Sequence, residues 1–512
     1  EQYYIYVALT RASDILYISY PLADEEGGAL MPSYIIRQLK RIYPLLEEEK
    51  WNIEPDGSDS DLDYVSSLSG GLTYLPQCLR TAIEGNKINP IWWDVYTWFV
   101  SKSRINCKQK LSGLFLKNQE ANISPRLIKG LFKSPIIASV SQLEKYQKCP
   151  FSHFMSYGLR LKERAVYKLD APDLGQFFHA SMNIITKKLI DNSINLADLN
   201  NEECKQITSE VVDTLAPQLQ NEILMSTSRY RYLSGKLKKT VERAVLTLRE
   251  HAKRGSFRPI GLELTFGDGG SLPPLVVELT DETAYIKLRG RIDRVDKAVY
   301  NDKIYLRVID YKSGMDRFEL EDIYYGLNLQ LLVYLEVVLQ YAHLLLGEKI
   351  IPGGIFHFKI DNPIITSPVP IEQRKIEKEI LKKLRMKGLV MADPQLVKLM
   401  DNEVSSGYSD LIPVAIRRDG SFYKNSSIAT EEQFDILRRH LCRVIKKIGD
   451  GIILGNVKIQ PYIKGRNTPC NYCKYDAICK FDKLLEENTY RVINTLSHDL
   501  VWQLLERKRG ED

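Results

Sequence analysis

The chain contains 512 residues, of which 44% are hydrophobic and 27% are charged, and its formal net charge is +6. This length exceeds one typical domain, so we expect two or three domains with a substantial core. The composition is ordinary for a globular protein, and the small positive excess fits a nucleic-acid partner without demonstrating one. No apolar run reaches the roughly 18 residues of a membrane span, and no signal peptide is recognisable, so we expect no membrane association.

The sequence does not start with Met. Its residues 3–20 predict two strands around a polar break. A hairpin or a strand–helix turn in an α/β core would explain this pattern. The segment VALTRAS at residues 7–13 also resembles the last motif of superfamily 1 helicases, in which the arginine, here Arg11, reaches the γ-phosphate of ATP. Because the chain has no G-x-x-x-x-G-K-S/T loop, Arg11 cannot complete a nucleotide-binding site by itself. We therefore expect the C-terminal part of a longer protein.

Three domains or segments are predicted along the chain. Residues 1–135 are expected to be the end of a superfamily 1 helicase-like α/β domain, and residues 121–138 to link it to the next domain. A second domain is predicted over residues 136–485, followed by a C-terminal helix over residues 486–512. This order places the chemistry-bearing residues in the second domain.

Two local patterns concern the packing of these domains. Trp92, Trp93 and Trp98 lie on one short segment, and such an aromatic group is more often core than a base-stacking platform. At the start of the second domain, Ser141 followed by Glu144 has the pattern of a helix capping box.

One helix is predicted before the central strands in the sequence, and another after them. Residues 173–190 predict an amphipathic helix that carries His179. Residues 320–346 predict one long helix that carries Gln330 and Tyr334. Taken alone, His179 fits best as an ordinary helix histidine.

Residues 290–314, GRIDRVDKAVYNDKIYLRVIDYKSG, predict a β-hairpin with a turn at residues 300–303. Side chains alternate along a strand, so Asp310 and Lys312 lie at the end of a face that is otherwise apolar. A carboxylate there is costly unless it is paired or bound to a cation, and Mg²⁺ or Mn²⁺ prefers such oxygen ligands. A surface Asp–Lys pair would explain D-x-K alone, but Asp293 on the first strand favours a catalytic site.

The catalytic interpretation assigns a role to each group. A bound metal can polarise a scissile phosphate and lower the pKa of a water, while Lys312 can orient that water or neutralise developing charge. Asp293 has the opposite strand parity from Ile292. We therefore expect a bulge or a twist that aims Asp293 inward.

Residues 139–480 resemble the RecB-type nuclease domain of the PD-(D/E)xK superfamily. The resemblance implies a restriction-endonuclease-like α/β core, with a central mixed sheet flanked by helices, and a metal-dependent deoxyribonuclease. It implies that the metal ligands are His179, Asp293, Asp310 and the carbonyl of Tyr311. It implies that the catalytic residues are Asp293, Asp310, Lys312, Gln330 and Tyr334, the last two forming a Q-x-x-x-Y motif that borders the DNA. Glu263 is a weaker match to an acidic residue that precedes this core.

Cys470, Cys473 and Cys479 have the short spacing of metal ligands, with one ligand missing. Zinc and an iron–sulfur cluster would each take four ligands, and Cys149 at the start of the same domain is the best candidate for the fourth. The spacing alone leaves zinc and a cluster equally open, and either would staple the two ends of the domain. The pattern resembles the 4Fe–4S nucleases of this superfamily, which favours the cluster.

Nearly the whole chain resembles the AddB family, the second subunits of the bacterial AddAB helicase–nucleases. This implies a cytoplasmic heterodimer with an AddA-type helicase–nuclease subunit, which resects double-strand DNA breaks for recombinational repair. It also implies that the site in this chain cuts the 5′-ended strand. Two alternatives remain: a stand-alone iron–sulfur exonuclease of single-stranded DNA, and a catalytically inert DNA-binding scaffold. Residues 1–135 argue against the first, and His179, Asp293, Asp310 and Lys312 argue against the second.

Overall fold

The computed structural model describes most of the chain, namely residues 2–24, 27–102, 109, 111–115, 117–118, 122–132, 134–164, 168–219, 223–314, 317–346, 350–367, 370–483, 485 and 487–507. The chain forms two compact units, Glu1–Leu116 and Lys117–Asp512. The predicted domain limits at residues 135 and 485 remain predictions. Within the described ranges, every helix is too short or too polar to cross a membrane.

The described elements of the first unit are helical, and those between residues 59 and 115 surround a small core. Its elements are α1 (Gln2–Thr10), α2 (Tyr34–Ile42), η1 (Asp59–Val65), α3 (Leu68–Ile83), α4 (Ile91–Lys102) and η2 (Ser112–Phe115). Leu75 of α3 packs with Trp92 of α4, which is fully buried and donates its indole N–H to Asp61 Oδ2 at 2.8 Å. Trp93 and Trp98 remain partly exposed. The predicted core role therefore holds for Trp92 alone among the three.

The two strands predicted over residues 3–20 are wrong. Gln2–Thr10 forms helix α1, and residues 11–20 have no regular structure. None of the residues of α1 is buried, and no described strand lies beside it. A strand without a neighbour leaves its backbone groups unpaired, whereas a helix satisfies them within the segment.

The second unit is organised around a six-stranded mixed sheet with the order β11-β8-β7-β6-β5-β2. Its strands are β2 (Arg258–Phe266), β5 (Gly290–Tyr300), β6 (Lys303–Lys312), β7 (Ile350–Lys359), β8 (Lys387–Met391) and β11 (Ile428–Ala429). β6 and β7 are parallel, as are β8 and β11, and the other neighbours are antiparallel. A second sheet has the order β1-β4-β3, formed by Ile136–Ala138, Tyr285–Leu288 and Leu275–Glu278.

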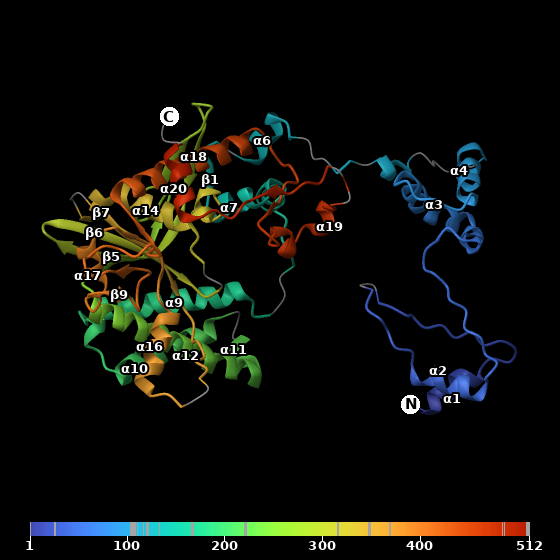
Figure 1. Ribbon diagram of the computed structural model, residues 1–512, viewed down its shortest axis with the longest axis horizontal. Coiled ribbons are helices and arrows are strands. Elements are labelled where there is room, and N and C mark those ends of the chain that lie inside the picture. Colours follow the sequence, from blue (N-terminus) through green and yellow to red (C-terminus); the bar gives the residue numbers. More distant parts are fainter. Residues whose placement is uncertain are drawn as a thin grey trace. The chain divides into compact units, whose positions relative to one another are not determined.

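Helices cover both faces of the main sheet (Figure 1). In this view α18 (Glu431–Ile453) and α20 (His498–Arg507) lie above the sheet, while α9 (Ala171–Asp191), α10 (Asn201–Leu215) and α12 (Ser228–Arg254) lie below it. Helix α14 (Gln330–Gln340) packs on β6 and β7. Because both faces are covered, β6 is buried along nearly its whole length. The prediction of a mixed sheet flanked by helices is confirmed.

The remaining elements connect these layers. They are α6 (Pro125–Leu131), α7 (Val140–Lys148), α8 (Pro150–His153), η3 (Phe154–Gly158), η4 (Leu196–Asp198), η5 (Ala216–Gln218), α11 (Ile223–Ser226), α13 (Leu320–Tyr324), α15 (Ala342–Leu346), α16 (Gln373–Lys383), α17 (Pro394–Met400), β9 (Gly407–Tyr408), β10 (Ala415–Ile416), β12 (Tyr462–Ile463), η6 (Pro469–Tyr472), α19 (Asp476–Cys479) and β13 (Arg491–Val492).

The predicted hairpin is confirmed as β5 and β6. Tyr300 pairs with Lys303, and the two residues between them have φ values of 49° and 57°. Positive φ at both central positions is the geometry of the two-residue turn whose twist matches that of the flanking strands. Asn301 and Asp302 suit it because their short polar side chains tolerate this conformation.

The long helix predicted over residues 320–346 is divided into α13, α14 and α15. The first break contains Gly326, whose φ of +73° ends the helical path. The capping box predicted at Ser141 also lies elsewhere: Ser139 caps α7, and its N–H bonds Gln142 Oε1 at 2.7 Å. Glu144 instead accepts the backbone N–H of Leu329 at 2.9 Å, which positions the start of α14.

The C-terminal helix begins at His498, later than the predicted residue 486. Arg491 and Val492 form β13, which pairs in parallel with Tyr462 and Ile463. The backbone hydrogen bonds of this short strand therefore prevail over the helical spacing of its apolar residues. The helix itself buries Val501 and Leu505 in the core of the second unit.

Candidate active site

Helix α9 places His179 at the edge of the sheet. The helix begins with a capping box, in which the Asp170 backbone N–H donates to Asp173 Oδ2 at 2.9 Å. Phe178 and its apolar neighbours face the core and fix the rotation of the helix. His179 is consequently half-buried, and its Nδ1 lies 3.1 Å from Asp293 Oδ1.

Three carboxylates lie beside one another on neighbouring strands. The register of β2 with β5 sets Glu263 opposite Asp293. The register of β5 with β6, in which Arg294 pairs with Ile309, sets Asp293 opposite Asp310 one position further along. Directly opposite residues in a sheet have Cβ atoms only about 5 Å apart. The fold therefore concentrates negative charge at this end of the strands.

The bulge expected in β5 is not found in its pairing with β6, which runs without a shift. Ile292 and Asp293 are both buried because helices cover both faces of the sheet, so their opposite parity requires no correction. The irregularity lies in β2, between Pro259 and Gly261. Close to it, Glu263 has a φ of +51°, a left-handed conformation that costs a non-glycine residue about 1 kcal/mol or more.

His179, Glu263 and Asp293 can share a metal ion. One ligand atom from each lies within 4.8 Å of the others. An imidazole nitrogen and two carboxylate oxygens form a donor set that suits a divalent cation. Arg291 Nε lies 2.6 Å from Glu263 Oε2 and balances part of the negative charge.

Asp310 is held by a separate set of contacts on the other side of Asp293. Its side chain is 1% exposed, and Lys312 Nζ lies 2.5 Å from Oδ2. Gln330 Nε2 donates to Asp310 Oδ1 at 2.9 Å, and Lys312 Nζ donates to Gln330 Oε1 at 2.7 Å. Tyr334 OH lies 2.8 Å from Gln330 Nε2. Gln330 thus fixes both members of the D-x-K pair.

The electrostatics of the site disfavour a full set of charged carboxylates. Burial raises the pKa of Asp310, and the neighbouring Asp293 raises it further against the opposing effect of Lys312. Burial, with Asp293, likewise raises the pKa of Glu263. Burial lowers the pKa of His179, but Asp293, Asp310 and Glu263 outweigh it, so the net shift is upward. A bound cation would relieve this repulsion.

A model of the PD-(D/E)XK nuclease superfamily matches residues 137–480. The chain belongs to this superfamily. A second model, described as the fifth domain of the ATP-dependent helicase/deoxyribonuclease AddB, matches residues 57–113. The two matches lie in the second and the first compact unit, respectively.

Curated relatives extend this likeness across the chain. It is 48% identical over 99% of its length to the B subunit of the ATP-dependent helicase/deoxyribonuclease of Pelotomaculum thermopropionicum. The proteins of the same name from Desulforamulus reducens and Desulforudis audaxviator are 45% and 42% identical over 100% and 99% of the chain. In each comparison the chain covers 44% of the relative. The expected resemblance to AddB proteins is confirmed, and the chain spans less than half the length of these relatives.

Gln330 of the Q-x-x-x-Y motif contacts both Asp310 and Lys312 of the D-x-K pair, as the superfamily resemblance implies. His179 contacts the neighbouring Asp293. The metal grouping differs in detail from the prediction, because Glu263, a weaker match, joins His179 and Asp293, while Asp310 bonds to Lys312 and Gln330. The Tyr311 backbone N–H donates to Asp293 Oδ2 at 2.8 Å. The ligand role of the Tyr311 carbonyl stays a prediction.

Of the four cysteines proposed as cluster ligands, Cys149 and Cys479 belong to one small hydrophobic cluster, although more than 300 residues separate them in the chain. Burial raises the pKa of Cys479 to about 12, and Cys149, Cys473 and Cys470 raise it as well. Burial also raises the pKa of Cys149. Cysteine thiolates are the ligands that zinc and iron–sulfur clusters take in proteins, and the assignment of these four residues to a cluster stays a prediction.

Arg11, the predicted nucleotide contact, is exposed and follows the end of α1 in the first unit. The helicase-like role of this residue stays a prediction.

Two residues near the site were missed by the sequence analysis. His357 pairs with Asp310 across β6 and β7, and its Nε2 lies 3.9 Å from Asp310 Oδ2. A histidine between two phenylalanines, Phe356 and Phe358, in the strand Ile350–Lys359 was the available signal. The second is Glu144, which accepts the backbone N–H of Leu329, the residue before Gln330. Its sequence pattern indicated a helix cap and nothing about this contact.

Proposed function

We propose that the chain is a metal-dependent deoxyribonuclease that hydrolyses phosphodiester bonds of DNA. The observation that carries the proposal is the arrangement of His179, Glu263 and Asp293 within 4.8 Å of one another, next to the buried pair Asp310–Lys312. The relatives are named as subunits of a helicase/deoxyribonuclease, which supports DNA as the substrate.

The residues that would hold a divalent cation, Mg²⁺ or Mn²⁺, are His179, Glu263, Asp293 and Asp310. When bound, such an ion polarises a phosphoryl oxygen and lowers the pKa of a nearby water. Lys312, whose side chain is 31% exposed at the rim, presents a positive charge to the phosphate as negative charge develops there. Gln330 orients Lys312, and Tyr334 orients Gln330.

The likeness to AddB proteins supports a proposal about the wider assembly. We propose that the chain acts in a cytoplasmic heterodimer with an AddA-type helicase–nuclease subunit and resects double-strand breaks for recombinational repair. Within that complex the site in this chain cuts the 5′-ended strand. The AddB-type match at residues 57–113 supports this assembly over a stand-alone exonuclease. Cys149, Cys470, Cys473 and Cys479 would hold a 4Fe–4S cluster that joins the two ends of the nuclease unit.

The test is cleavage of a single-stranded DNA oligonucleotide in the presence of Mg²⁺. We expect the parent chain to cut it and Asp310→Ala to lose about 100-fold or more of the rate. Asp213→Ala, which removes a carboxylate that is 63% exposed on α10, is the matched control and should cut normally. Labels at the 5′ or the 3′ end report the polarity. Equal rates for Asp310→Ala and the parent would refute the proposal.

A further inference from the structure

A cavity of about 270 Å³ is lined by residues 317–319, 382, 383 and 385–388, with Pro413 and Ser427. We name it the basic pocket, because five of its lining residues are cationic: Arg317, Lys382, Lys383, Arg385 and Lys387. Glu319 contributes a negative charge, and Phe318 contributes an aromatic ring. The lining therefore has a clear excess of positive charge together with one apolar surface.

The pairing of neighbouring strands relates the basic pocket to the three carboxylates Glu263, Asp293 and Asp310. Asp310 on β6 pairs with His357 on β7, and His357 pairs with Lys387 on β8. Two strand spacings of about 4.8 Å separate Asp310 from Lys387, or roughly 10 Å in all. Phe318 extends the connection, because its ring centroid lies 6.4 Å from that of His357 in an edge-on contact. Lys387, which lines the pocket, is thus aligned with Asp310 across the sheet.

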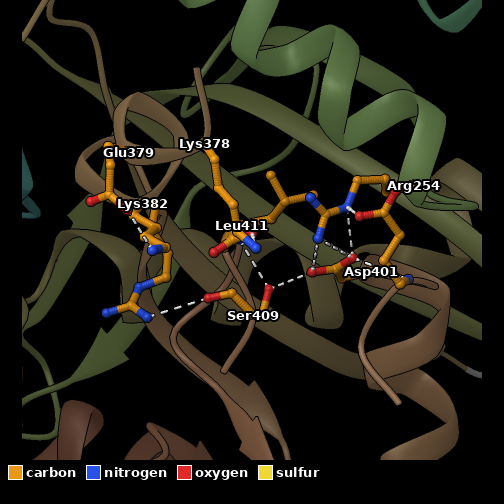
Figure 2. A network of polar contacts seen from close by, with 10 residues as sticks. Arg254, Lys378, Glu379, Lys382, Asp401, Ser409 and Leu411 are labelled. Atoms are coloured by element: carbon orange, nitrogen blue, oxygen red, sulfur yellow. Dashed lines mark hydrogen bonds and ion pairs between the residues drawn. The ribbon is translucent and has the colours of Figure 1, made fainter. Parts of the chain in front are cut away.

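One wall of the pocket is anchored in the protein interior. Arg385 donates to the carbonyl of Ser409 at 3.3 Å, and Ser409 Oγ donates to Asp401 Oδ2 at 2.6 Å. Asp401 is buried and accepts two bonds from Arg254, at 2.9 and 2.8 Å. Figure 2 shows this chain of contacts, with Asp401 between Arg254 and Ser409. The Arg385 side chain is consequently held by a segment that is anchored in the core.

Two lysines of the pocket, Lys382 and Lys383, each have one hydrogen bond within the protein. Lys382 Nζ lies 2.6 Å from Glu379 Oε1 (Figure 2), and Lys383 Nζ donates to the carbonyl of Ile364 at 2.9 Å. An ammonium group has three N–H donors, so each of these contacts leaves capacity for a second acceptor. Lys383 and Lys387 are exposed. An anion with several oxygens matches such a group of cations.

We propose that the basic pocket binds a backbone phosphate of the DNA strand being cut, within about three nucleotides of the scissile phosphate. The inference rests on the proposed nuclease function, because the place of the pocket on the strand is measured from Asp310 of the proposed catalytic site. Strand pairing aligns Asp310 with Lys387 through His357. The phosphates of one strand follow one another about every 3.4 Å along the axis of a helix and lie further apart than this in space, so a distance of roughly 10 Å spans at most about three nucleotides. Contacts to phosphate are independent of base sequence, so the pocket positions the strand without selecting it.

The test measures binding without cleavage, so it is independent of catalysis. A labelled single-stranded oligonucleotide of about 16 nucleotides is titrated with protein in EDTA at several salt concentrations. We expect Lys383→Ala/Lys387→Ala to weaken binding about tenfold and to reduce the slope of log K against log salt by about 0.7 for each lost phosphate contact. The Lys383→Arg/Lys387→Arg variant should bind like the parent.

The matched control is Lys188→Ala/Lys205→Ala, which removes two exposed charges from α9 and α10. It should leave affinity and slope unchanged. If the pocket variant equals this control in both quantities, the assignment of the pocket is wrong. A different result is weaker DNA binding by Lys383→Ala/Lys387→Ala, as expected, together with unimpaired cutting by Asp310→Ala. It would refute the nuclease site and leave the pocket as a DNA contact.

Discussion

Replacing Lys312 by alanine should destabilise the metal-free protein, because the ammonium group pairs with a buried carboxylate. Lys312 Nζ lies 2.5 Å from Asp310 Oδ2, and the Asp310 side chain is 1% exposed. Breaking a buried pair by removing one partner costs about 3–5 kcal/mol. The Lys312 side chain is 31% exposed, so solvent screens the pair and we expect a loss of about 1–3 kcal/mol.

Urea unfolding followed by circular dichroism measures this loss. Lys287→Ala is the matched control, since Lys287 pairs at 3.2 Å with Asp268, whose side chain is 60% exposed. Breaking that surface pair should cost less than about 1 kcal/mol. Mg²⁺ should restore part of the stability of Lys312→Ala, because a cation at the carboxylates relieves the repulsion around Asp310.

The same variant should lose about 100-fold of its DNA-cleaving activity, because it lacks the positive charge that meets the phosphate. Two results would refute the reasoning. Equal stability losses in Lys312→Ala and Lys287→Ala would show that the burial of Asp310 has no energetic consequence. Full activity in Lys312→Ala would remove the lysine from the proposed chemistry.

Two further predictions concern the cysteines and a buried histidine. Cys473→Ala should lose bound iron and sulfide by chemical analysis, whereas Cys442→Ala, outside the quartet, should retain them; zinc without iron in the parent would contradict the cluster. Burial lowers the pKa of His251 well below its usual range, with Arg307 and other arginines acting in the same direction. Its contribution to stability is therefore complete above about pH 6.5 and falls by about 1.4 kcal/mol per pH unit below it. In acid unfolding curves His251→Phe should lose less stability than the parent between pH 7 and 5, and parallel curves would exclude this role.

Much of the central architecture was accessible from the sequence because local signals agreed with the tertiary structure. The hairpin of β5 and β6 combined apolar strands with a turn whose Asn301 and Asp302 tolerate positive φ. The strand period then set Asp310 and Lys312 on one face. The same reasoning placed His179 on an amphipathic helix, and α9 is observed as predicted.

Other features depended on partners that local sequence does not specify. Gln2–Thr10 is apolar enough for a strand, but no described strand lies beside it, and it forms a helix. The bulge or twist expected at Asp293 would be needed only if one face of the strand were buried, whereas helices cover both faces of the sheet (Figure 1). His357 and Lys387 are aligned with Asp310 only by the registers of β6 with β7 and of β7 with β8.

The most direct test of the central claim is Mn²⁺ binding to the parent chain and to Asp293→Asn, measured by isothermal titration calorimetry. Asp293 lies between the histidine–glutamate group and Asp310, so we expect the variant to lose binding while it remains folded. Asp213→Asn, which changes an exposed carboxylate, should bind like the parent. Identical binding by the parent and Asp293→Asn would contradict the assignment of these strands to a metal-dependent nuclease site.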